Sequence, residues 1–273
     1  MNIVKKLAFL AVSVLAFGAT SASADKLDKI LSKGTIRCGV VLDFPPMGYR
    51  DAKNNPAGFD VEYCKDLAKA LGVKLELKSM SFAQRLPALN AGKVDVVIGS
   101  TSDTLQRAKS AGFTMPYFVF KLQAMVKKDS GIKEFKDLKG KKITAALSTT
   151  PETEFLKNAK ANGWDSSNYF SSKKESDTHL ALLQGKADAI ITTDTTIVEL
   201  LKLPKYKDYT AGPFVPGFDD FVSIIVKRTE YGMINYMNLF IHQQVRSGRY
   251  KELNKMFYGN SPVRKLTVDG IYY

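Results

Sequence analysis

Charged and polar side chains follow several strand-like segments of this sequence, at the points where the segments end. In open α/β sheets, ligands bind outside the carboxyl ends of the strands. Arg107 offers a planar guanidinium that suits a carboxylate, and Asp194 offers a carboxylate that suits an ammonium group, aided by the hydroxyl of Ser102. The two charges together predict a site for a zwitterion of amino-acid size.

Uncharged side chains near the ends of predicted strands complete the candidate site. Thr150 precedes a predicted helix, where free backbone N–H groups favour an anion. Phe44 and Phe82 would flank the ligand and exclude water. Each residue also has a simpler interpretation: Arg107 as a surface ion-pair residue, Thr150 and Asp194 as helix caps, and the two phenylalanines as core. The prediction therefore depends on their convergence.

The elements that must position these residues alternate between strands and helices, which indicates parallel βαβ units. The first half has strands at 35–41, 74–77 and 94–99 and helices at 59–71 and 83–91. The second half repeats this order, with strands at 143–147, 169–171 and 187–192 and helices at 151–162 and 177–184. The sequence therefore predicts two α/β lobes of comparable build.

Two further strand-like segments, 117–126 and 221–226, lie on either side of the second half. If they connect the lobes, the second lobe is inserted into the first, and the helical stretch 229–257 returns to the first lobe. We accordingly expect one lobe at 25–118 and 223–273 and the other at 119–222.

The first 24 residues have the pattern of a secretory signal peptide. Lys5 and Lys6 precede a short apolar run at 7–19, and small residues lead to a cleavage site after Ala24. The run is shorter than the ~20 residues that span a bilayer. We expect a soluble exported protein.

The composition excludes several other classes of protein. The 273 residues are 45% apolar and 25% charged, which is typical of globular proteins, and two His and two Cys leave little room for a metal site. We expect no metal and no cofactor. The net charge is +13, but its densest stretch, 127–142, is interrupted by acids and glycines, so we interpret it as a solvated face and expect no nucleic acid.

Cys38 and Cys64 allow two interpretations. Cys38 lies in a predicted strand and Cys64 on the apolar face of a predicted helix. They could form a disulfide in an oxidising compartment. Since sequence cannot fix the geometry that a bridge requires, we favour two separate buried thiols.

Several motifs resemble the polar amino-acid family of periplasmic solute-binding proteins, which serve ABC transporters. They are PPMGY at 45–49, GFDVE at 58–62, GKVDVVIGSTSDTLQR at 92–107 and SGRY at 247–250. The resemblance covers essentially the whole mature chain. It implies a type II, two-lobed periplasmic binding protein-like fold, with two hinge strands and closure of the lobes on a ligand.

The resemblance also implies roles for individual residues. Arg107 would hold the α-carboxylate, beside backbone N–H groups of Ser102 and Thr150. The Ser100 carbonyl, the Ser102 hydroxyl and Asp194 would hold the α-ammonium. Phe44 and Phe82 would sandwich the ligand, and Arg85 matches a position that meets the ligand side chain in some members. The spacing before Asp194 is one residue longer than in several members, so Thr193 is an alternative ammonium partner.

The resemblance implies a binding protein, not an enzyme, that works as a monomer in the periplasm with a membrane permease. A cyclohexadienyl or arogenate dehydratase on the same fold is the alternative, with Glu175 or Asp194 as its general acid. An acidic or polar ligand is slightly favoured by Arg85 and the basic charge, whereas Asp43 and Glu175 favour a basic or neutral one.

Overall fold

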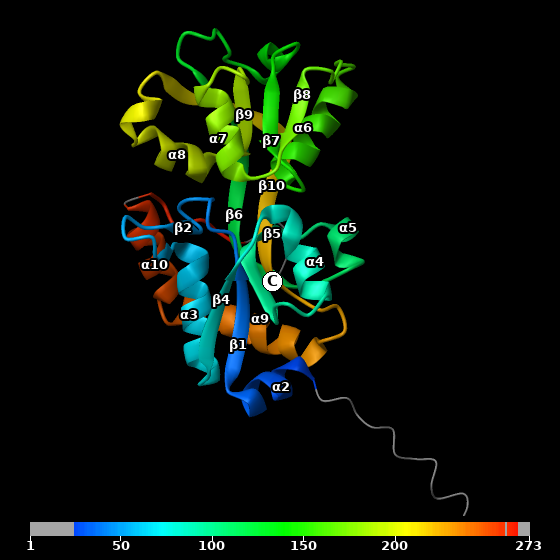
Figure 1. Ribbon diagram of the computed structural model, residues 1–273, viewed down its shortest axis with the longest axis vertical. Helices are drawn as coiled ribbons and strands as arrows, with labels where there is room; N and C mark the ends of the chain where they lie inside the picture. Colours follow the sequence, from blue (N-terminus) through cyan, green and yellow to red (C-terminus); the bar gives the residue numbers. More distant parts are fainter. Residues whose placement is uncertain (1–24, 260, 267–273) are drawn as a thin grey trace, which may run out of the picture.

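Two α/β lobes share one eight-stranded sheet in the computed structural model, which describes residues 25–259 and 261–266 (Figure 1). The predicted signal peptide lies outside the described residues. The strands of the sheet are β1 (Thr35–Val40), β4 (Lys74–Ser79), β5 (Val96–Ser102), β6 (Gly112–Lys127), β7 (Ile143–Ala146), β8 (Tyr169–Ser172), β9 (Ala189–Thr193) and β10 (Tyr209–Val226). Their order across the sheet is β4-β1-β5-β10-β6-β9-β7-β8.

Parallel pairing within each lobe confirms the predicted βαβ units. Strand β1 pairs in parallel with β4 and β5 in the first lobe, and β7 pairs in parallel with β8 and β9 in the second. The corresponding strand predictions lie within two or three residues of the observed bounds. The largest difference is at the end of β5, which continues three residues beyond the predicted end to Ser102 and so carries the predicted site residues Ser100 and Ser102 inside the strand.

Two long antiparallel strands, β6 and β10, connect the lobes. They run side by side from one lobe into the other (Figure 1), and their pairing extends from Val226↔Gly112 to Tyr209↔Lys127. The crossings expected at 117–126 and 221–226 lie within them. The lobe boundaries expected at 118/119 and 222/223 also fall in these strands, and they stay a prediction.

Helices cover both faces of the sheet in each lobe. Those of the first lobe are α2 (Lys26–Lys33), α3 (Phe59–Leu71), α4 (Arg85–Asn90), α5 (Leu105–Ala108), α9 (Tyr231–Arg246) and α10 (Arg249–Tyr258). Those of the second are α6 (Thr150–Ala161), α7 (Glu175–Leu183) and α8 (Asp194–Leu201). The chain returns to the first lobe at α9, as expected. Helices α2 and α5 were not predicted, and α8 was expected only as a helix after Asp194, without bounds. Among the described residues, no helix is long and apolar enough to cross a membrane.

Short elements complete the fold. They are the 3-10 helices η1 (Phe82–Gln84), η2 (Phe135–Leu138) and η3 (Pro204–Tyr206), and the two-stranded sheet of β2 (Tyr49–Arg50) and β3 (Pro56–Ala57). The helix expected at 83–91 is thus divided between η1 and α4. The main cores lie on either side of the lobe junction: Phe59 and Leu67 belong to the first, and Phe155 and Ile191 to the second.

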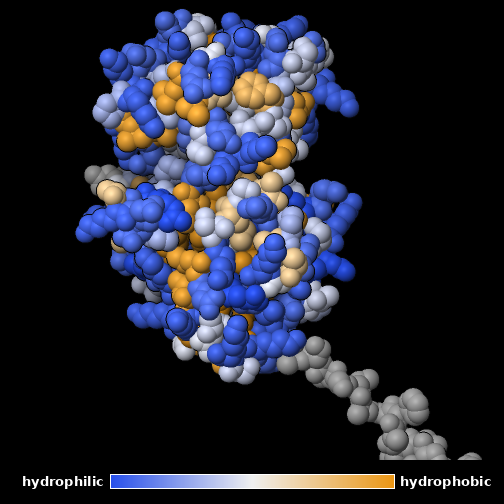
Figure 2. Space-filling view, in the orientation of Figure 1, coloured by the Kyte–Doolittle hydropathy of each residue, from blue (hydrophilic) through white to orange (hydrophobic). Residues whose placement is uncertain are grey.

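The surface is mostly hydrophilic on the face shown in Figure 2, with apolar side chains gathered in small areas. The seven lysines of the basic stretch 127–142 are all exposed. This exposure agrees with the interpretation of the stretch as a solvated face.

The interpretation of the two cysteines as separate thiols is wrong. Cys38 and Cys64 form a disulfide that joins β1 to α3, with their Cα atoms 6.1 Å apart. Both residues are fully buried because the apolar stripe of α3, which includes Leu67 and Leu71, packs on the first lobe's sheet. That packing places the two side chains within bonding distance, which the sequence pattern alone did not determine.

Replacing both cysteines with alanine should lower the free energy of unfolding by about 3 kcal/mol, because the bridge closes a chain segment with a sequence separation of 26 residues. Denaturant unfolding of the oxidised wild type and the double variant measures the difference. The wild type under reducing conditions is the control. Equal unfolding midpoints for all three samples would contradict the stabilising role of the bridge.

Candidate functional site

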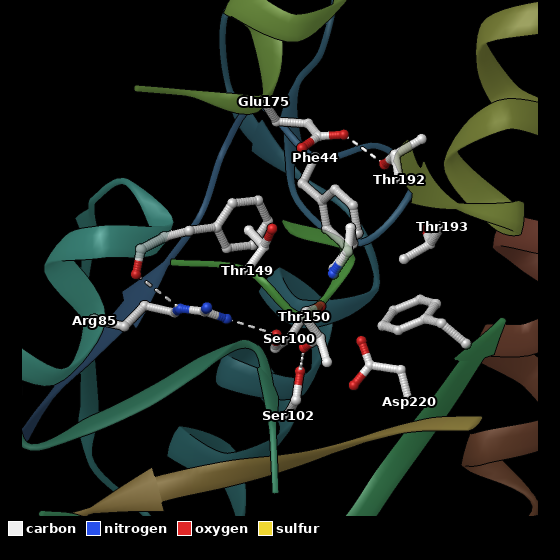
Figure 3. A pocket seen from close by; sticks show the side chains of 13 residues that line it. Phe44, Arg85, Ser100, Ser102, Thr149, Thr150, Glu175, Thr192, Thr193 and Asp220 are labelled. Atoms are coloured by element: carbon white, nitrogen blue, oxygen red, sulfur yellow. Dashed lines mark hydrogen bonds between the residues drawn. The ribbon is translucent and has the colours of Figure 1, made fainter. Parts of the chain in front are cut away.

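A pocket lies where the two lobes meet, and it contains about 310 Å³ of space not filled by protein atoms (Figure 3). Strands β5, β6, β9 and β10, the helices α6 and α7, and the loop after β1 all contribute side chains. The lining residues are Phe44, Phe82, Arg85, Ser100, Ser102, Phe120, Thr149, Thr150, Pro151, Glu175, Thr192, Thr193 and Asp220.

Six of the eight predicted site residues line this pocket. They are Phe44, Phe82, Arg85, Ser100, Ser102 and Thr150. The other two, Arg107 and Asp194, lie outside the lining and are bound to other groups. Phe120, Pro151, Thr192 and Asp220 line the pocket without having been singled out from the sequence.

Three aromatic rings form the apolar wall of the pocket. The Phe44 ring meets Phe82 at 5.1 Å and Phe120 at 5.8 Å between centroids, in both cases edge to face. The backbone of Phe44 is fixed by two hydrogen bonds with Gly48. A side chain at Gly48 would place its Cβ 2.0 Å from the carbonyl oxygen of Val41, so only glycine fits this turn.

The guanidinium of Arg85 is buried at the first-lobe side of the pocket, with 2% of the residue exposed. It donates hydrogen bonds to four backbone carbonyl oxygens, those of Phe82 (3.0 Å), Gly99 (2.8 Å), Ser100 (2.6 Å) and Ser148 (3.3 Å). Burial and the nearby charge of Arg107 lower the pKa of Arg85 to about 9, so it remains a cation at neutral pH.

Two serines outside the usual backbone regions present carbonyl oxygens to this cation. Ser100 has φ +49° and Ser148 has φ +64°, the left-handed region that non-glycine residues seldom adopt. The surrounding structure holds Ser100 there: its hydroxyl donates to Asp60 (3.0 Å), and its N–H donates to the hydroxyl of Tyr117 (3.0 Å). Such strained positions cluster at functional sites.

The carboxyl group of Asp60 anchors the network behind Ser100. It also accepts a hydrogen bond from the Tyr117 hydroxyl at 2.7 Å, and it is 1% exposed. Burial raises the pKa of Asp60 to about 7, although the hydrogen bonds from Tyr117 and Ser100 and the charge of Arg85 oppose the rise. Asp60 belongs to the GFDVE motif, so this motif supports the pocket from behind.

Arg107 lies beside the pocket and reaches across to the second lobe. Its guanidinium donates to the carbonyl oxygens of Ser102 (3.2 Å) and Ser148 (2.9 Å). The Ser148 carbonyl oxygen therefore accepts hydrogen bonds from both Arg85 and Arg107. Burial lowers the pKa of Arg107 from its usual value, and the carboxylate of Asp220 opposes this shift.

Two buried carboxyl groups line the pocket. Asp220 on β10 and Glu175 at the start of α7 are each 3% exposed. The carboxylate of Glu175 accepts a hydrogen bond from the hydroxyl of Thr192 and lies 3.5 Å from Nε2 of His179. Asp220 escaped the sequence analysis because it stands within an antiparallel crossing strand, whereas the rule applied there considers only the carboxyl ends of strands.

Asp194 does not reach the pocket, which corrects its predicted position. It is the first residue of α8, and its carboxylate pairs with the guanidinium of Arg264 at 2.6 Å. It also accepts hydrogen bonds from the backbone N–H groups of Lys121 (3.2 Å) and Thr195 (2.9 Å). Thr193, the alternative residue, does line the pocket.

Further contacts join the lobes around the pocket. The hydroxyl of Thr196 donates to the carbonyl oxygen of Pro45 at 3.0 Å, and the Ser176 hydroxyl and backbone N–H donate to Asp43 at 3.2 Å. The hydroxyls of Ser102 and Thr150 also share a hydrogen bond across the lobes. Asp43 therefore contributes to lobe contact and does not line the pocket.

Comparison with known proteins identifies the family. Residues 36–260 match the family model described as bacterial extracellular solute-binding proteins, family 3. The chain belongs to this family. The predicted resemblance is confirmed by this match, which covers most of the chain.

Three relatives illustrate the similarity. The L-cystine-binding protein TcyJ of Escherichia coli (strain K12) is 28% identical over 254 residues, which are 92% of this chain and 93% of that protein. The solved cysteine-binding protein of Campylobacter jejuni has a TM-score of 0.79 at 26% identity and covers 91% of this chain and 97% of its own. The ancestral amino acid-binding protein AncCDT-1, a precursor of cyclohexadienyl dehydratase, has a TM-score of 0.76 at 28% identity, with coverages of 85% and 99%.

These comparisons confirm two predictions about this family 3 solute-binding protein. Its fold is the type II, two-lobed periplasmic binding-protein fold. It is a binding protein and not an enzyme, as the family and these relatives are. Even the ancestral relative that precedes a dehydratase is described as an amino acid-binding protein.

Replacing Arg264 with alanine should weaken ligand binding about three- to tenfold, although Arg264 does not line the pocket. The pair with Asp194 bridges the lobes, so its loss favours separated lobes and lowers the fraction able to bind. Calorimetry measures the affinity, and small-angle scattering measures the separation. The exposed neighbour Lys265, changed to alanine, is the control, and identical behaviour of the two variants would contradict a role for the pair.

Proposed function

We propose that this protein captures an amino acid between its two lobes in the periplasm and delivers it to the permease of an ABC transporter. The observation that carries the proposal is the charge of the pocket. A guanidinium faces it from the first lobe, and two buried carboxyl groups line it, on β10 and α7. Buried charges of both signs around one small volume suit a zwitterion.

The carboxylate of the ligand would lie at the N-terminus of α6. This 12-residue helix points its first turn at the pocket through Thr149, Thr150 and Pro151, and helix N-termini favour anions. Arg107 would leave the Ser148 carbonyl and bind the carboxylate, because an ionised acceptor makes a stronger hydrogen bond than a neutral one. Backbone N–H groups of Ser102 and Thr150 would assist.

A polar ligand side chain suits the remaining lining. Thr192 and Glu175 offer oxygen atoms at the second lobe, whereas Arg85 offers a cation at the first. Two of the relatives are named as an L-cystine-binding and a cysteine-binding protein. The slight preference for an acidic side chain stays a prediction, since Glu175 would repel it and Arg85 would attract it.

Closure would follow from contacts that a ligand makes with both lobes. Only a ligand that touches both lobes stabilises the closed arrangement over the open one. The transporter would then recognise the closed form, and we expect the binding protein to act as a monomer.

A thermal-shift screen of the twenty amino acids tests the proposal. An amino acid that binds only the folded state raises the melting temperature, by an amount that grows with its concentration relative to Kd. At least one polar amino acid should raise it by several degrees. If none of the twenty shifts the melting temperature or gives heat in calorimetry, the proposed function fails.

Replacing Arg107 with alanine should weaken binding of that amino acid about 100-fold, because the carboxylate would lose a charge-assisted partner in a desolvated site. Arg107→Lys should lose less affinity, since lysine keeps the positive charge but lacks the planar guanidinium that binds both carboxylate oxygens. Calorimetry with matched circular dichroism spectra measures both variants. If Arg107→Ala binds the amino acid as tightly as wild type, Arg107 does not bind the ligand carboxylate.

A further inference from the structure

One carboxylate oxygen in the pocket has no hydrogen-bond partner among the described residues. It is Oδ1 of Asp220, which is buried. The side chain points toward the Ser102 and Thr150 hydroxyls in the close view (Figure 3), and the residue is 3% exposed. Buried acceptors that lack a donor are rare in proteins because the loss of hydration is not compensated. The pocket is therefore incomplete at this atom, and a donor from a ligand would complete it.

The other acidic groups around the pocket already have donors. Asp194 is paired with Arg264 and accepts two backbone N–H groups. Glu175 accepts the hydroxyl of Thr192 and lies beside His179. Neither has the unmet acceptor that Asp220 presents.

The neighbours of Asp220 suit a cation. Asp220 is opposite Phe120 in the register of β10 and β6, and the rings of Phe120 and Phe44 form the adjacent wall. The hydroxyl of Ser102 supplies a second acceptor next to the carboxylate. A compact ammonium group would thus meet a carboxylate, a hydroxyl and aromatic carbon at once.

We propose that Asp220, on the crossing strand β10, binds the α-ammonium group of the amino acid, and that Asp194 does not. This inference rests on the proposed function and specifies its ammonium site. Asp220 thereby determines that the site takes α-amino acids and rejects carboxylic acids that lack the amino group.

The protonation of Asp220 makes this site sensitive to pH. Burial raises the pKa of Asp220 to about 6, against the opposing influence of the Ser102 hydroxyl and of the charges of Arg107 and Arg85; Asp103 adds to the rise. The carboxylate is ionised above that pH and neutral below it. An ammonium group gains the full attraction only from the ionised form, so affinity should fall as the pH falls through 6.

The test compares two ligands on matched variants. The first ligand is the amino acid that binds most tightly in the screen, and the second is its des-amino analogue, in which hydrogen replaces the α-ammonium group. Wild type should prefer the amino acid by about 100-fold, and Asp220→Asn should reduce this preference to less than about tenfold. Asp219→Asn is the matched control, because Asp219 is the exposed neighbour on the same strand.

Asp194→Asn separates this proposal from its alternative. It should keep the preference for the amino acid over the des-amino analogue, even if both ligands bind more weakly because the lobes separate more readily. If Asp194→Asn loses the preference and Asp220→Asn keeps it, the proposal is overturned. Failure of every amino acid to bind wild type would instead overturn the proposed function.

A second measurement on wild type needs no variant. Between pH 7 and pH 5, affinity for the amino acid should fall about tenfold, because a group with a pKa of about 6 passes from mostly ionised to mostly protonated. Affinity for the des-amino analogue should not fall in this way. Asp60 titrates in the same range, but it contacts Ser100 behind the pocket and acts on both ligands alike. Parallel pH profiles for the two ligands would contradict the role of Asp220.

Discussion

The buried cation of Arg85 is the constraint around which the pocket is organised. A charge removed from water is costly unless polar groups replace the lost hydration, and here four backbone carbonyl oxygens do so. Three come from the first lobe and one, that of Ser148, from the second. The cation is therefore fully surrounded only when the lobes are in contact, which couples its solvation to the arrangement of the whole molecule.

The rest of the first lobe maintains this arrangement. Ser100 can present its carbonyl only in a left-handed backbone conformation, and the Asp60 and Tyr117 side chains hold it there. Asp60 lies in the first turn of α3, and the disulfide of Cys64 fixes the next turn of that helix to β1. A chain of contacts thus runs from the hydrophobic core of the lobe to the surface of the pocket.

Sequence reasoning located the architecture and most of the pocket for a physical reason. The alternation of strands and helices is a local pattern, and the carboxyl ends of parallel strands meet at one edge, so Ser102 and Thr150 could be placed together. The same rule missed Asp220, because it considers only the ends of strands. Asp220 lies in the middle of an antiparallel strand that crosses between the lobes. It misplaced Asp194, whose partner Arg264 is 70 residues away in the chain. The disulfide likewise depended on how α3 packs, which no local pattern contains.

The position of Asp220 and Phe120 on paired crossing strands has a mechanical consequence. These strands join the lobes, so under the proposed closure they would bend, and the floor of the pocket would also be the pivot. A small rotation in these strands would produce a larger displacement at the outer rim of the lobes, because the rim lies farther from the axis of rotation. Substitutions on these two strands should therefore alter recognition and lobe motion together, whereas substitutions at the rim can alter either one alone.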